Sequence, residues 1–185
     1  MVHWREAEMK KAYPLEKVYG LLEPGPVVLL STQRKGKANV MTLSWHVMLD
    51  FEPPLVGCVV SDRNYTFELL RDTQECVINI PTEKLAKKVV ACGNASGRSV
   101  DKFKKYGLTA QPAATVEAPL IAECYANLEC RAVDPRMVEH YCFFVLEVVQ
   151  AWIDPATKWP RTMHHRGMGE FMIAGKRLKL RSRMK

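Results

Sequence analysis

An almost unbroken apolar run, Cys142–Trp152, sets the firmest limit on how this chain can fold. It is rich in β-branched and aromatic residues, and only Glu147 and Gln150 interrupt it with polar side chains. Residues of these types favour extended backbone, and a run this apolar indicates a strand covered along most of its length. The run therefore predicts a strand inside a barrel.

Other β-rich segments recur at short spacing along the chain. Strands are predicted at Val27–Thr32, Asn39–His46, Leu55–Val60, Cys76–Ile80 and Asn127–Val133, with weaker candidates at Glu170–Ile173 and Arg177–Leu180. Arg34–Lys37 is polar and typical of a hairpin tip. No G-x-G-x-x-G follows a strand, which disfavours a Rossmann nucleotide site. The pattern favours a mainly β fold with short helices, a barrel rather than a doubly wound sheet.

Short helices are predicted between these strands, each marked by its terminal residues. They are Tyr13–Leu22 with Pro14 in its first turn, a helix that begins near Tyr65, one from Thr82 to Cys92, and Val100–Tyr106 with Ser99 as its cap and Gly107 as its stop. The two prolines in Phe51–Pro54 forbid helix and indicate a rigid connection.

Length and composition predict an ordinary globular protein. The chain has 185 residues, of which 48% are hydrophobic and 25% are charged. No composition break or repeat appears, so we expect a single domain over residues 1–185. The N-terminal residues 1–6 are charged and lack the apolar core of a signal peptide, and no apolar run is long enough to span a bilayer. We therefore expect a cytoplasmic protein with no membrane segment.

Six cysteines are present, none spaced as C-x-x-C, and most lie in apolar segments that resemble strands. Buried, reduced thiols are the prediction, with a redox or metal role kept open because Cys124 and Cys130 lie close in sequence. The pair His164-His165 also invites a metal interpretation. Adjacent residues of a strand point to opposite faces, however, so a surface position or a place at the edge of a bound ligand is favoured for them.

Basic charge is concentrated at the C-terminal end. The net charge is +7, and the segment from about 174 to 185 contributes +6 of it through residues 176, 177, 179, 181, 183 and 185. A nucleic-acid binder usually spreads such charge over a folded face with aromatics between. We expect a solvated tail or edge strand instead, which makes nucleic-acid binding the weaker interpretation.

One candidate ligand surface is the strand made of Asn39, Val40, Met41, Thr42, Leu43, Ser44 and Trp45. Thr42 and Ser44 alternate with apolar residues, so one face carries small polar side chains. A flat heterocycle needs such a surface, with apolar cover at one end and hydrogen-bonding groups at the other. On its own the segment is better interpreted as a plain amphipathic strand with a half-buried face.

A second candidate, Ser61-Asp-Arg-Asn-Tyr-Thr66, follows a buried strand and opens a helix. Backbone N–H groups at a helix N-terminus attract an anion. Ser61, Asn64 and Thr66 can add donors, and Arg63 can supply a charge-assisted contact to a phosphate. The alternative is an ordinary polar loop with a helix cap and a solvated arginine.

A third candidate is the loop Gly93-Asn-Ala-Ser-Gly-Arg98. Asn94, Ser96 and Gly97 suit a tight loop that approaches another chain or a ligand closely. Arg98 beside it could reach a phosphate or the rim of a ligand. A plain loop before a capped helix is the alternative. Motifs for side-chain catalysis (G-x-S-x-G, H-E-x-x-H, a P-loop) do not occur.

Taken together, these segments resemble the flavin-reductase-like family, particularly its flavoredoxin branch of FMN-binding split β-barrels. The motifs occur in order: Asn39–Trp45, Pro53-Pro54-Leu55 leading to Ser61–Thr66, Val77–Pro81, and Ser96–Phe103. The resemblance extends from about Pro26 to Trp152. It implies a split barrel and a homodimer, with FMN near the subunit interface.

The resemblance also implies roles for the candidate residues. Asn39–Trp45 would line the isoalloxazine, and Ser61, Arg63, Tyr65 and Thr66 would hold the ribityl phosphate. The loop Ser96, Gly97 and Arg98 would meet the flavin, from the partner subunit if the interface lies there, with Lys102 and Phe103 at the same wall.

Three functions remain open from the sequence. The leading one is an FMN-dependent oxidoreductase of the flavin reductase type, in which the cofactor carries the chemistry and NAD(P)H is one candidate donor. A second is an electron-transfer flavoprotein reduced by a protein partner, which the basic tail could dock. A flavin-free barrel that binds a nucleotide or nucleic acid ranks last.

Overall fold

The computed structural model describes residues 10–22 and 25–181, in which antiparallel strands dominate. The described strands are β1 (Lys11–Ala12), β2 (Val28–Arg34), β3 (Lys37–Leu43), β4 (His46–Phe51), β5 (Pro54–Val59), β6 (Glu75–Ile80), β7 (Ala110–Gln111), β8 (Leu120–Ile121), β9 (Ala126–Asp134), β10 (Phe143–Ile153), β11 (Met163–Gly167) and β12 (Glu170–Ile173). The helices are α1 (Tyr19–Leu22), α2 (Tyr65–Thr73), α3 (Ala86–Gly93), α4 (Lys102–Tyr106) and α5 (Val138–Tyr141), with short 3-10 turns at Leu15–Lys17 and Glu83–Leu85.

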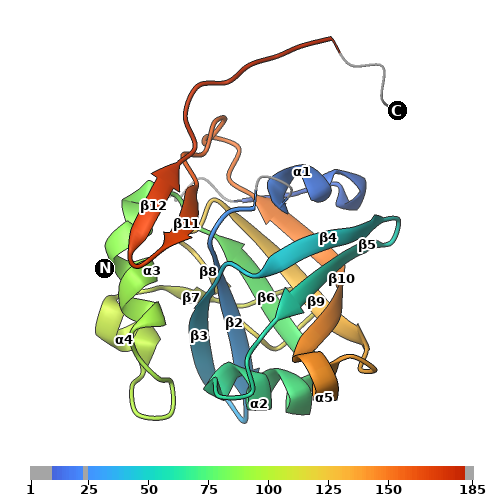
Figure 1. Ribbon diagram of the computed structural model, residues 1–185, viewed down its shortest axis with the longest axis vertical. Coiled ribbons are helices and arrows are strands. Elements are labelled where there is room, and N and C mark those ends of the chain that lie inside the picture. Colours follow the sequence, from blue (N-terminus) through green and yellow to red (C-terminus); the bar gives the residue numbers. More distant parts are fainter. Residues whose placement is uncertain (1–9, 23–24, 182–185) are drawn as a thin grey trace, which may run out of the picture.

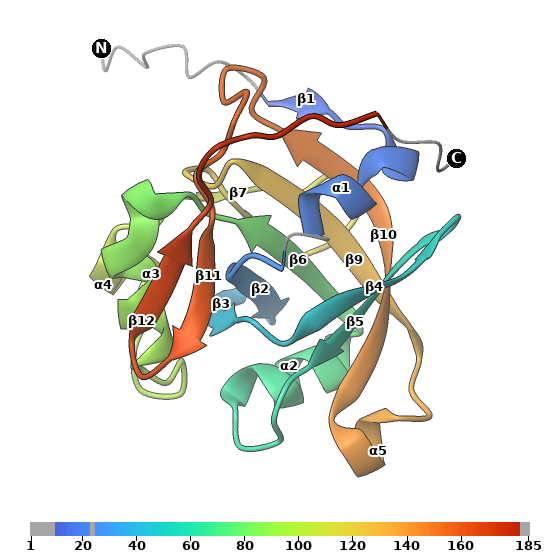
Figure 2. The same ribbon diagram turned by 45° about the horizontal axis from the view of Figure 1, so that its top comes forward.

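The main sheet has the strand order β3-β2-β6-β9-β10-β5-β4, with β1 added to β10. It curls around a core, as Figures 1 and 2 show, and every pairing in it is antiparallel. The longest strand, β10, lies between β9 and β5, so both of its edges are paired. The predicted mainly β barrel is confirmed, and the apolar run that predicted it forms its longest strand.

Two apolar clusters stabilise this arrangement. The larger lies inside the curled sheet, where Phe67 of α2 meets Phe144 of β10 edge to face at 5.5 Å. The second lies between β2–β3 and the layer of α3, α4 and the β11–β12 hairpin, and includes Val40, Val89 and Phe103. Figure 1 shows this layer on one side of the sheet. The helices and hairpin therefore sit on the same flank of β3.

Most predicted elements are found, with shifted ends. The Arg34–Lys37 turn does join β2 to β3, with Lys35 and Gly36 at positive φ. The predicted strand Asn39–His46 was wrong in its extent: β3 ends at Leu43, and a separate strand, β4, begins at His46. The chain turns at Ser44–Trp45, and β4 then pairs with β5 through the turn that contains Pro53.

Two other predictions were wrong. The cap of α4 is Asp101 rather than Ser99, because the Asp101 carboxylate accepts a hydrogen bond from the Lys104 backbone N–H at 3.1 Å. The stop at Gly107 is confirmed by its left-handed backbone. Arg177–Leu180 forms no strand in the described tail, where no neighbouring strand is available to pair with it.

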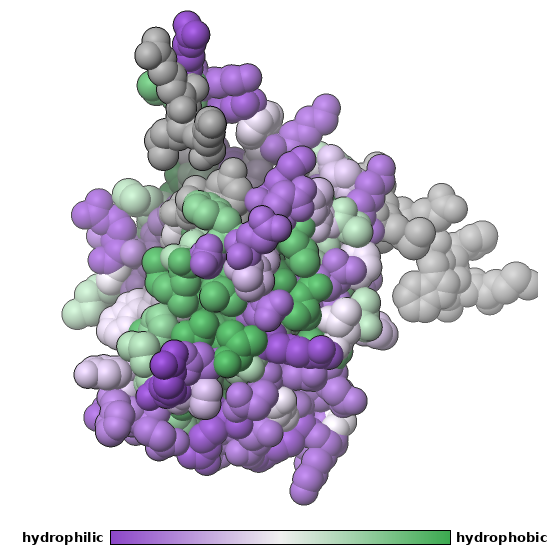
Figure 3. Space-filling model, turned by 90° about the vertical axis from the view of Figure 1, so that its right-hand side faces the viewer, coloured by the Kyte–Doolittle hydropathy of each residue, from purple (hydrophilic) through white to green (hydrophobic). Residues whose placement is uncertain are grey.

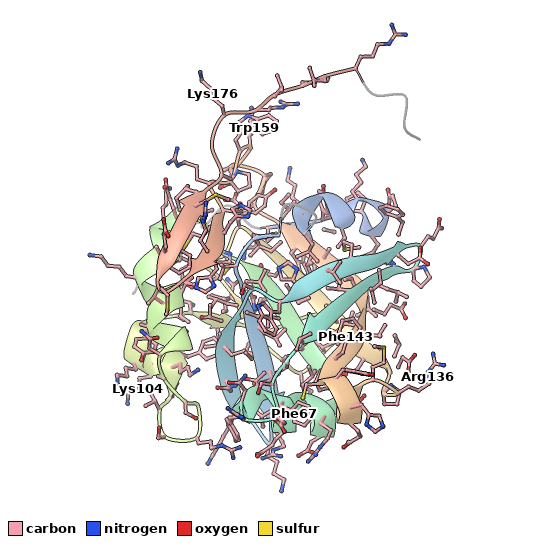
Figure 4. All side chains as sticks on the ribbon, in the orientation of Figure 1. Phe67, Lys104, Arg136, Phe143, Trp159 and Lys176 are labelled. Atoms are coloured by element: carbon pink, nitrogen blue, oxygen red, sulfur yellow. The ribbon has the colours of Figure 1, made fainter. Side chains whose placement is uncertain are left out.

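The tail is exposed from residue 175 to residue 181. Its one aromatic contact comes at its base, where the Arg177 guanidinium lies 3.9 Å from the centre of the Trp159 ring. Figure 4 shows Trp159 beside Lys176 at this end of the molecule. A solvated tail agrees with the sequence prediction, although Arg183 and Lys185 lie outside the described residues, as do the N-terminal residues 1–9.

Strand β9 contributes a carboxylate with no exposure to solvent. Glu129 accepts hydrogen bonds from the backbone N–H groups of Ala114 and Thr115 at 2.9 and 2.6 Å, and from Trp152 Nε1 at 2.7 Å. Burial alone would raise the pKa of Glu129, but these hydrogen bonds outweigh burial and lower it. Glu129 thus fastens the loop before β8 to the barrel as a carboxylate.

The outer face of the sheet at β5 and β10 is apolar. Gly57 lies directly opposite Val47 on β4 and Val145 on β10, and Val59 lies opposite Phe143. The Phe143 ring covers Gly57 so closely that a Cβ there would clash with it. Figure 3 shows hydrophobic residues gathered on this side of the molecule. The side chains of Val47 and Leu49 are 51% and 45% exposed, so this face has no cover in a single chain.

All six cysteines are free, and all except Cys142 are buried, as predicted. Cys124 and Cys130, which are close in sequence, pack in different clusters. In the described part of the chain, no group of His, Cys, Asp and Glu residues is arranged to hold a metal ion. The same part contains no helix long and apolar enough to cross a membrane.

Candidate functional site

A cavity of about 240 Å³ lies where the start of α2, strand β3 and the loop after α3 meet. Strand β3 contributes Asn39 and Met41, and the loop contributes residues 93 to 97. The three candidate segments, from β3, from the start of α2 and from the loop after α3, therefore meet at one cavity. The fold achieves this because β2–β3 packs against α2 on one side and α3 on the other.

The wall formed by α2 is its N-terminal turn. Arg63, Asn64, Tyr65 and Thr66 line the cavity, and Asn64 is the N-cap residue in extended conformation. Its side chain makes no capping hydrogen bond to the helix. The first backbone N–H groups of α2 are thus at the cavity wall, where an anion would interact favourably with them and with the helix dipole.

The charged side chains that line this cavity are both basic, Arg63 and Lys102. Lys102 is 5% exposed, and its Nζ donates a hydrogen bond to the carbonyl oxygen of Cys92 at 2.8 Å. Burial lowers the pKa of the Lys102 ammonium. Burying a cation costs free energy, and the described lining of this cavity has no carboxylate to pair with it. The site therefore favours a negatively charged ligand.

A buried acceptor also faces the cavity without a partner. Asn39 is 5% exposed, and its Nδ2 donates to Thr66 Oγ1 at 2.9 Å. Its Oδ1 has no hydrogen-bond partner among the described residues. Such atoms are uncommon in proteins because an unsatisfied buried acceptor is costly. A ligand that donates a hydrogen bond would satisfy it.

Gly97 lies directly against this asparagine. A Cβ at Gly97 would overlap Asn39 Oδ1 and would lie 2.8 Å from Asn39 Cγ and 3.1 Å from Tyr65 Cδ1. Only glycine lets the loop approach β3 and α2 this closely, as the sequence predicted for a tight loop. The loop, β3 and α2 therefore form one wall around the cavity.

Arg98, predicted to meet the ligand, is not among the residues that line this cavity. Its guanidinium makes two hydrogen bonds to Glu68 of α2, one of them 3.0 Å long, and lies 5.1 Å from the centre of the Tyr65 ring. The hydrogen bond from Arg98 holds the pKa of the Glu68 carboxyl below its usual range. Arg98 thus fastens the loop to α2 and neutralises the nearest carboxylate, and it lines a neighbouring cavity together with Phe103.

The remaining predicted residues lie around the cavity or away from it. Ser61 is in the turn before α2, where its Oγ accepts a hydrogen bond from the Arg63 N–H at 3.3 Å. Val40 and Leu43 are core residues, and the Trp45 side chain is 70% exposed. Alternation along β3 places Val40 in the apolar cluster on the side of α3 and Leu43 in the cluster inside the barrel.

Thr42 and Ser44 line a second cavity of about 250 Å³, which shares Gly93 and Asn94 with the first. Its walls are mostly apolar, from Val27, Val89, Val90 and Phe171, with His165 at one side. Thr42 Oγ1 donates to the carbonyl oxygen of Val89 at 2.6 Å, which ties β3 to α3. Val27, Val89, Val90 and Phe171 were not among the predicted site residues, because only the fold brings α3 and the late hairpin to β3.

The two adjoining cavities differ in character: the first offers cations, N–H donors and an acceptor, and the second offers flat apolar cover. This combination suits an elongated ligand with an anionic end and a ring end.

Comparison with known proteins agrees with this geometry. The family model described as "Flavin reductase like domain" matches residues 21–171. The uncharacterized protein YddH of Escherichia coli is 32% identical over 92% of this chain and 98% of its own length. An uncharacterized protein of Archaeoglobus fulgidus is 39% identical over 61% of this chain, and the match spans 64% of that relative, just under two thirds of its length.

Solved structures share the same fold. An FMN-binding domain of a flavin reductases-like enzyme from Shewanella baltica superposes with a TM-score of 0.86 at 29% identity, covering 94% of this chain and 98% of that one. Flavoredoxin from Methanosarcina acetivorans gives a TM-score of 0.71 at 27% identity, covering 84% and 87%. The predicted resemblance and the predicted split barrel are both confirmed.

Proposed function

We propose that this chain, which belongs to the flavin reductase-like family, is an oxidoreductase that binds FMN across the two adjoining cavities and passes electrons through it. The unpartnered Asn39 Oδ1 beside two basic side chains is the observation that carries the proposal. FMN brings what these groups lack: a phosphate dianion for the cations and ribityl hydroxyls for the free acceptor.

At the anionic end, Arg63 supplies a guanidinium that matches a phosphate in shape, and Lys102 adds a second positive charge. The first N–H groups of α2 donate hydrogen bonds to the same group. Thr66 fixes the Asn39 side chain through their mutual hydrogen bond, which leaves Oδ1 beside Gly97 of the loop. These residues bind and orient the ligand, and none needs to exchange a proton during the reaction.

At the ring end, Val27, which precedes β2, and the α3 residues Val89 and Val90 exclude water from one part of the second cavity. Thr42, Ser44 and the backbone at Gly93 and Asn94 provide hydrogen-bonding groups at its rim. When bound, FMN supplies the redox chemistry, and the protein supplies position and polarity. Within this proposal NAD(P)H is the candidate donor.

The proposal is tested by adding FMN to the protein freed of flavin, then NADH or NADPH without oxygen. We expect saturable FMN binding, followed by bleaching of the bound flavin at 450 nm on the order of seconds to minutes with one of the two donors. A protein that takes up no FMN would contradict the flavoprotein proposal. A protein that binds FMN but is reduced by neither nucleotide would contradict the choice of donor alone.

A second candidate donor is a protein, and the exposed tail favours it. Lys176, Arg177, Lys179 and Arg181 are all exposed and carry no acidic neighbours in the tail. Such a segment can steer an acidic redox partner toward the site. Deletion of residues 175–185 should then slow reduction by that partner and weaken its salt dependence, while reduction by a small-molecule donor stays the same.

We also propose that two copies of this chain pair through the apolar outer face of β4, β5 and β10. Val47, Leu49 and Phe51 of the edge strand β4 are exposed, and the face that they border is apolar. An exposed apolar face of this kind usually marks an interface. Val47→Glu should yield monomers in light scattering, whereas Leu178→Glu, on the exposed tail, should leave the dimer intact. A wild-type monomer would contradict this proposal.

A further inference from the structure

The β11–β12 hairpin is fixed at its base and projects from the barrel. Met163, the first residue of β11, is 1% exposed, and its carbonyl oxygen accepts a hydrogen bond from the Val27 N–H at 2.7 Å. The N–H of Ala174, just after β12, donates to the carbonyl oxygen of Thr162 at 2.9 Å. At the other end, Met168 is fully exposed in the turn. The hairpin is therefore positioned firmly enough to act as a wall.

That wall closes one side of the second cavity. His165 of β11 and Phe171 of β12 are direct partners across the hairpin, and both line the cavity, as does Gly169 of the turn. Figure 2 shows the hairpin beside α3, whose residues Val89 and Val90 line the same cavity. The remaining side is formed by Thr42 of β3 and by Ser44, which follows the end of that strand.

The two neighbouring histidines of β11 take different positions. The His165 ring lies 5.3 Å from the Phe171 ring at an interplanar angle of 46°, so the two form one aromatic surface. His164 Nε2 lies 3.1 Å from Thr162 Oγ1 and is not among the residues that line the cavity. Alternation along the strand separates them, as the sequence predicted for adjacent residues.

His165 is also the one imidazole among the described residues that line either adjoining cavity. Its N–H groups can donate to, and its unprotonated nitrogen can accept from, heteroatoms at the edge of a ring system. No other described side chain that lines the second cavity offers both an aromatic face and a hydrogen-bonding group.

We propose that His165, supported by Phe171, is a positioning residue that contacts the ring system of the bound flavin from the hairpin side. The inference rests on the proposed FMN site, and it adds a segment that lies more than sixty residues after the last sequence motif assigned to that site. His165 would orient the ring and adjust its reduction potential, whereas His164 would do neither.

The test compares His165→Ala with the matched variant His164→Ala, using flavin-depleted protein titrated with FMN. We expect His165→Ala to weaken FMN binding about 2- to 12-fold, the range for loss of one aromatic contact. It should also alter the visible circular dichroism and the reduction potential of the bound flavin. His164→Ala should match the wild type in all three measurements.

His165→Phe separates the two parts of the role. It keeps an aromatic face and should restore most of the affinity, while the reduction potential stays shifted because the hydrogen-bonding group is gone. The same variant can be used for the test if His165→Ala does not fold.

Identical dichroism and potential in the wild type and in both His165 variants would overturn this inference and leave the FMN site itself intact. A wild type that binds no FMN would overturn both proposals. Equal effects from His164→Ala and His165→Ala would reduce the hairpin to a general structural support and would also overturn the inference.

Discussion

Replacing Gly97 with alanine tests whether the close approach of the loop to β3 forms the ligand cavity. The added Cβ would overlap Asn39 Oδ1 and lie 2.8 Å from Asn39 Cγ. Asn39 cannot give way, because it is buried and its Nδ2 is hydrogen-bonded to Thr66. The loop must therefore lift from the strand.

The added methyl group should destabilise the free protein little and the FMN-bound protein more. In the free protein the loop can lift at small cost, because its main tie, the Arg98–Glu68 ion pair, is half exposed and such pairs contribute less than about 1 kcal/mol. FMN binding requires the loop to stay against β3, and there the added Cβ overpacks the contact with Asn39 at a cost of about 1–3 kcal/mol. FMN affinity should then fall about 5- to 150-fold, with the free energy of unfolding reduced by less than about 1 kcal/mol.

Fluorescence titration with FMN measures the affinity, and urea denaturation measures the stability. Gly175→Ala is the matched control, since a Cβ there meets no atom within 4 Å. If Gly97→Ala binds FMN as tightly as the wild type, the wall where Gly97 meets Asn39 does not contact the ligand. A large loss of stability with unchanged FMN affinity would refute the reasoning that the substitution destabilises mainly the bound protein.

Three further changes test the packing and electrostatics around the site. Glu129→Gln should lower the free energy of unfolding by about 1–3 kcal/mol at pH 7, because one buried N–H loses its acceptor. Because the pKa of Glu129 is lowered in the folded protein, this carboxylate takes up a proton in the unfolded chain first as the pH falls. The wild type should therefore lose stability below pH 4.5, the ordinary pKa of a glutamate. In urea melts at pH 3–7 the variant should lose less stability than the wild type. Phe144→Ala should cost about 3–5 kcal/mol in the same assay, since the ring is 1% exposed in the core. Glu68→Gln should change stability by less than about 1 kcal/mol and should weaken FMN binding slightly, as titration would reveal, because the loop loses its ion pair to α2.

The sequence predicted the strands that local pattern alone determines. The run that became β10 and the hairpin turn at Arg34–Lys37 are of this kind. The break at Ser44–Trp45 was missed because alternation continues through it, and only the pairing of β4 with β5 reveals the turn. Arg177–Leu180 has strand-like residues, but a strand needs a partner that the tail does not have.

The site was predictable in part for the same reason. Arg63 and Gly97 stood out because a helix N-terminus and a tight loop have local signatures. The contact of Arg98 with Glu68, which is distant in sequence, has no local signature, and its predicted contact with the ligand stays a prediction. His165 and Phe171 reach the second cavity only through the packing of the late hairpin against α3, which no local pattern indicates.

The central claim, an FMN phosphate held at the start of α2, is tested most directly by comparing FMN with riboflavin, which lacks the phosphate. The wild type should bind FMN much more tightly than riboflavin. Arg63→Ala should weaken FMN about 10- to 150-fold, the equivalent of one charge-assisted hydrogen bond of about 1.5–3 kcal/mol, and should leave riboflavin affinity unchanged. Arg71→Ala, on the same helix but outside the cavity lining, should affect neither ligand. Equal losses for both ligands, or no loss of FMN affinity in Arg63→Ala, would contradict the account.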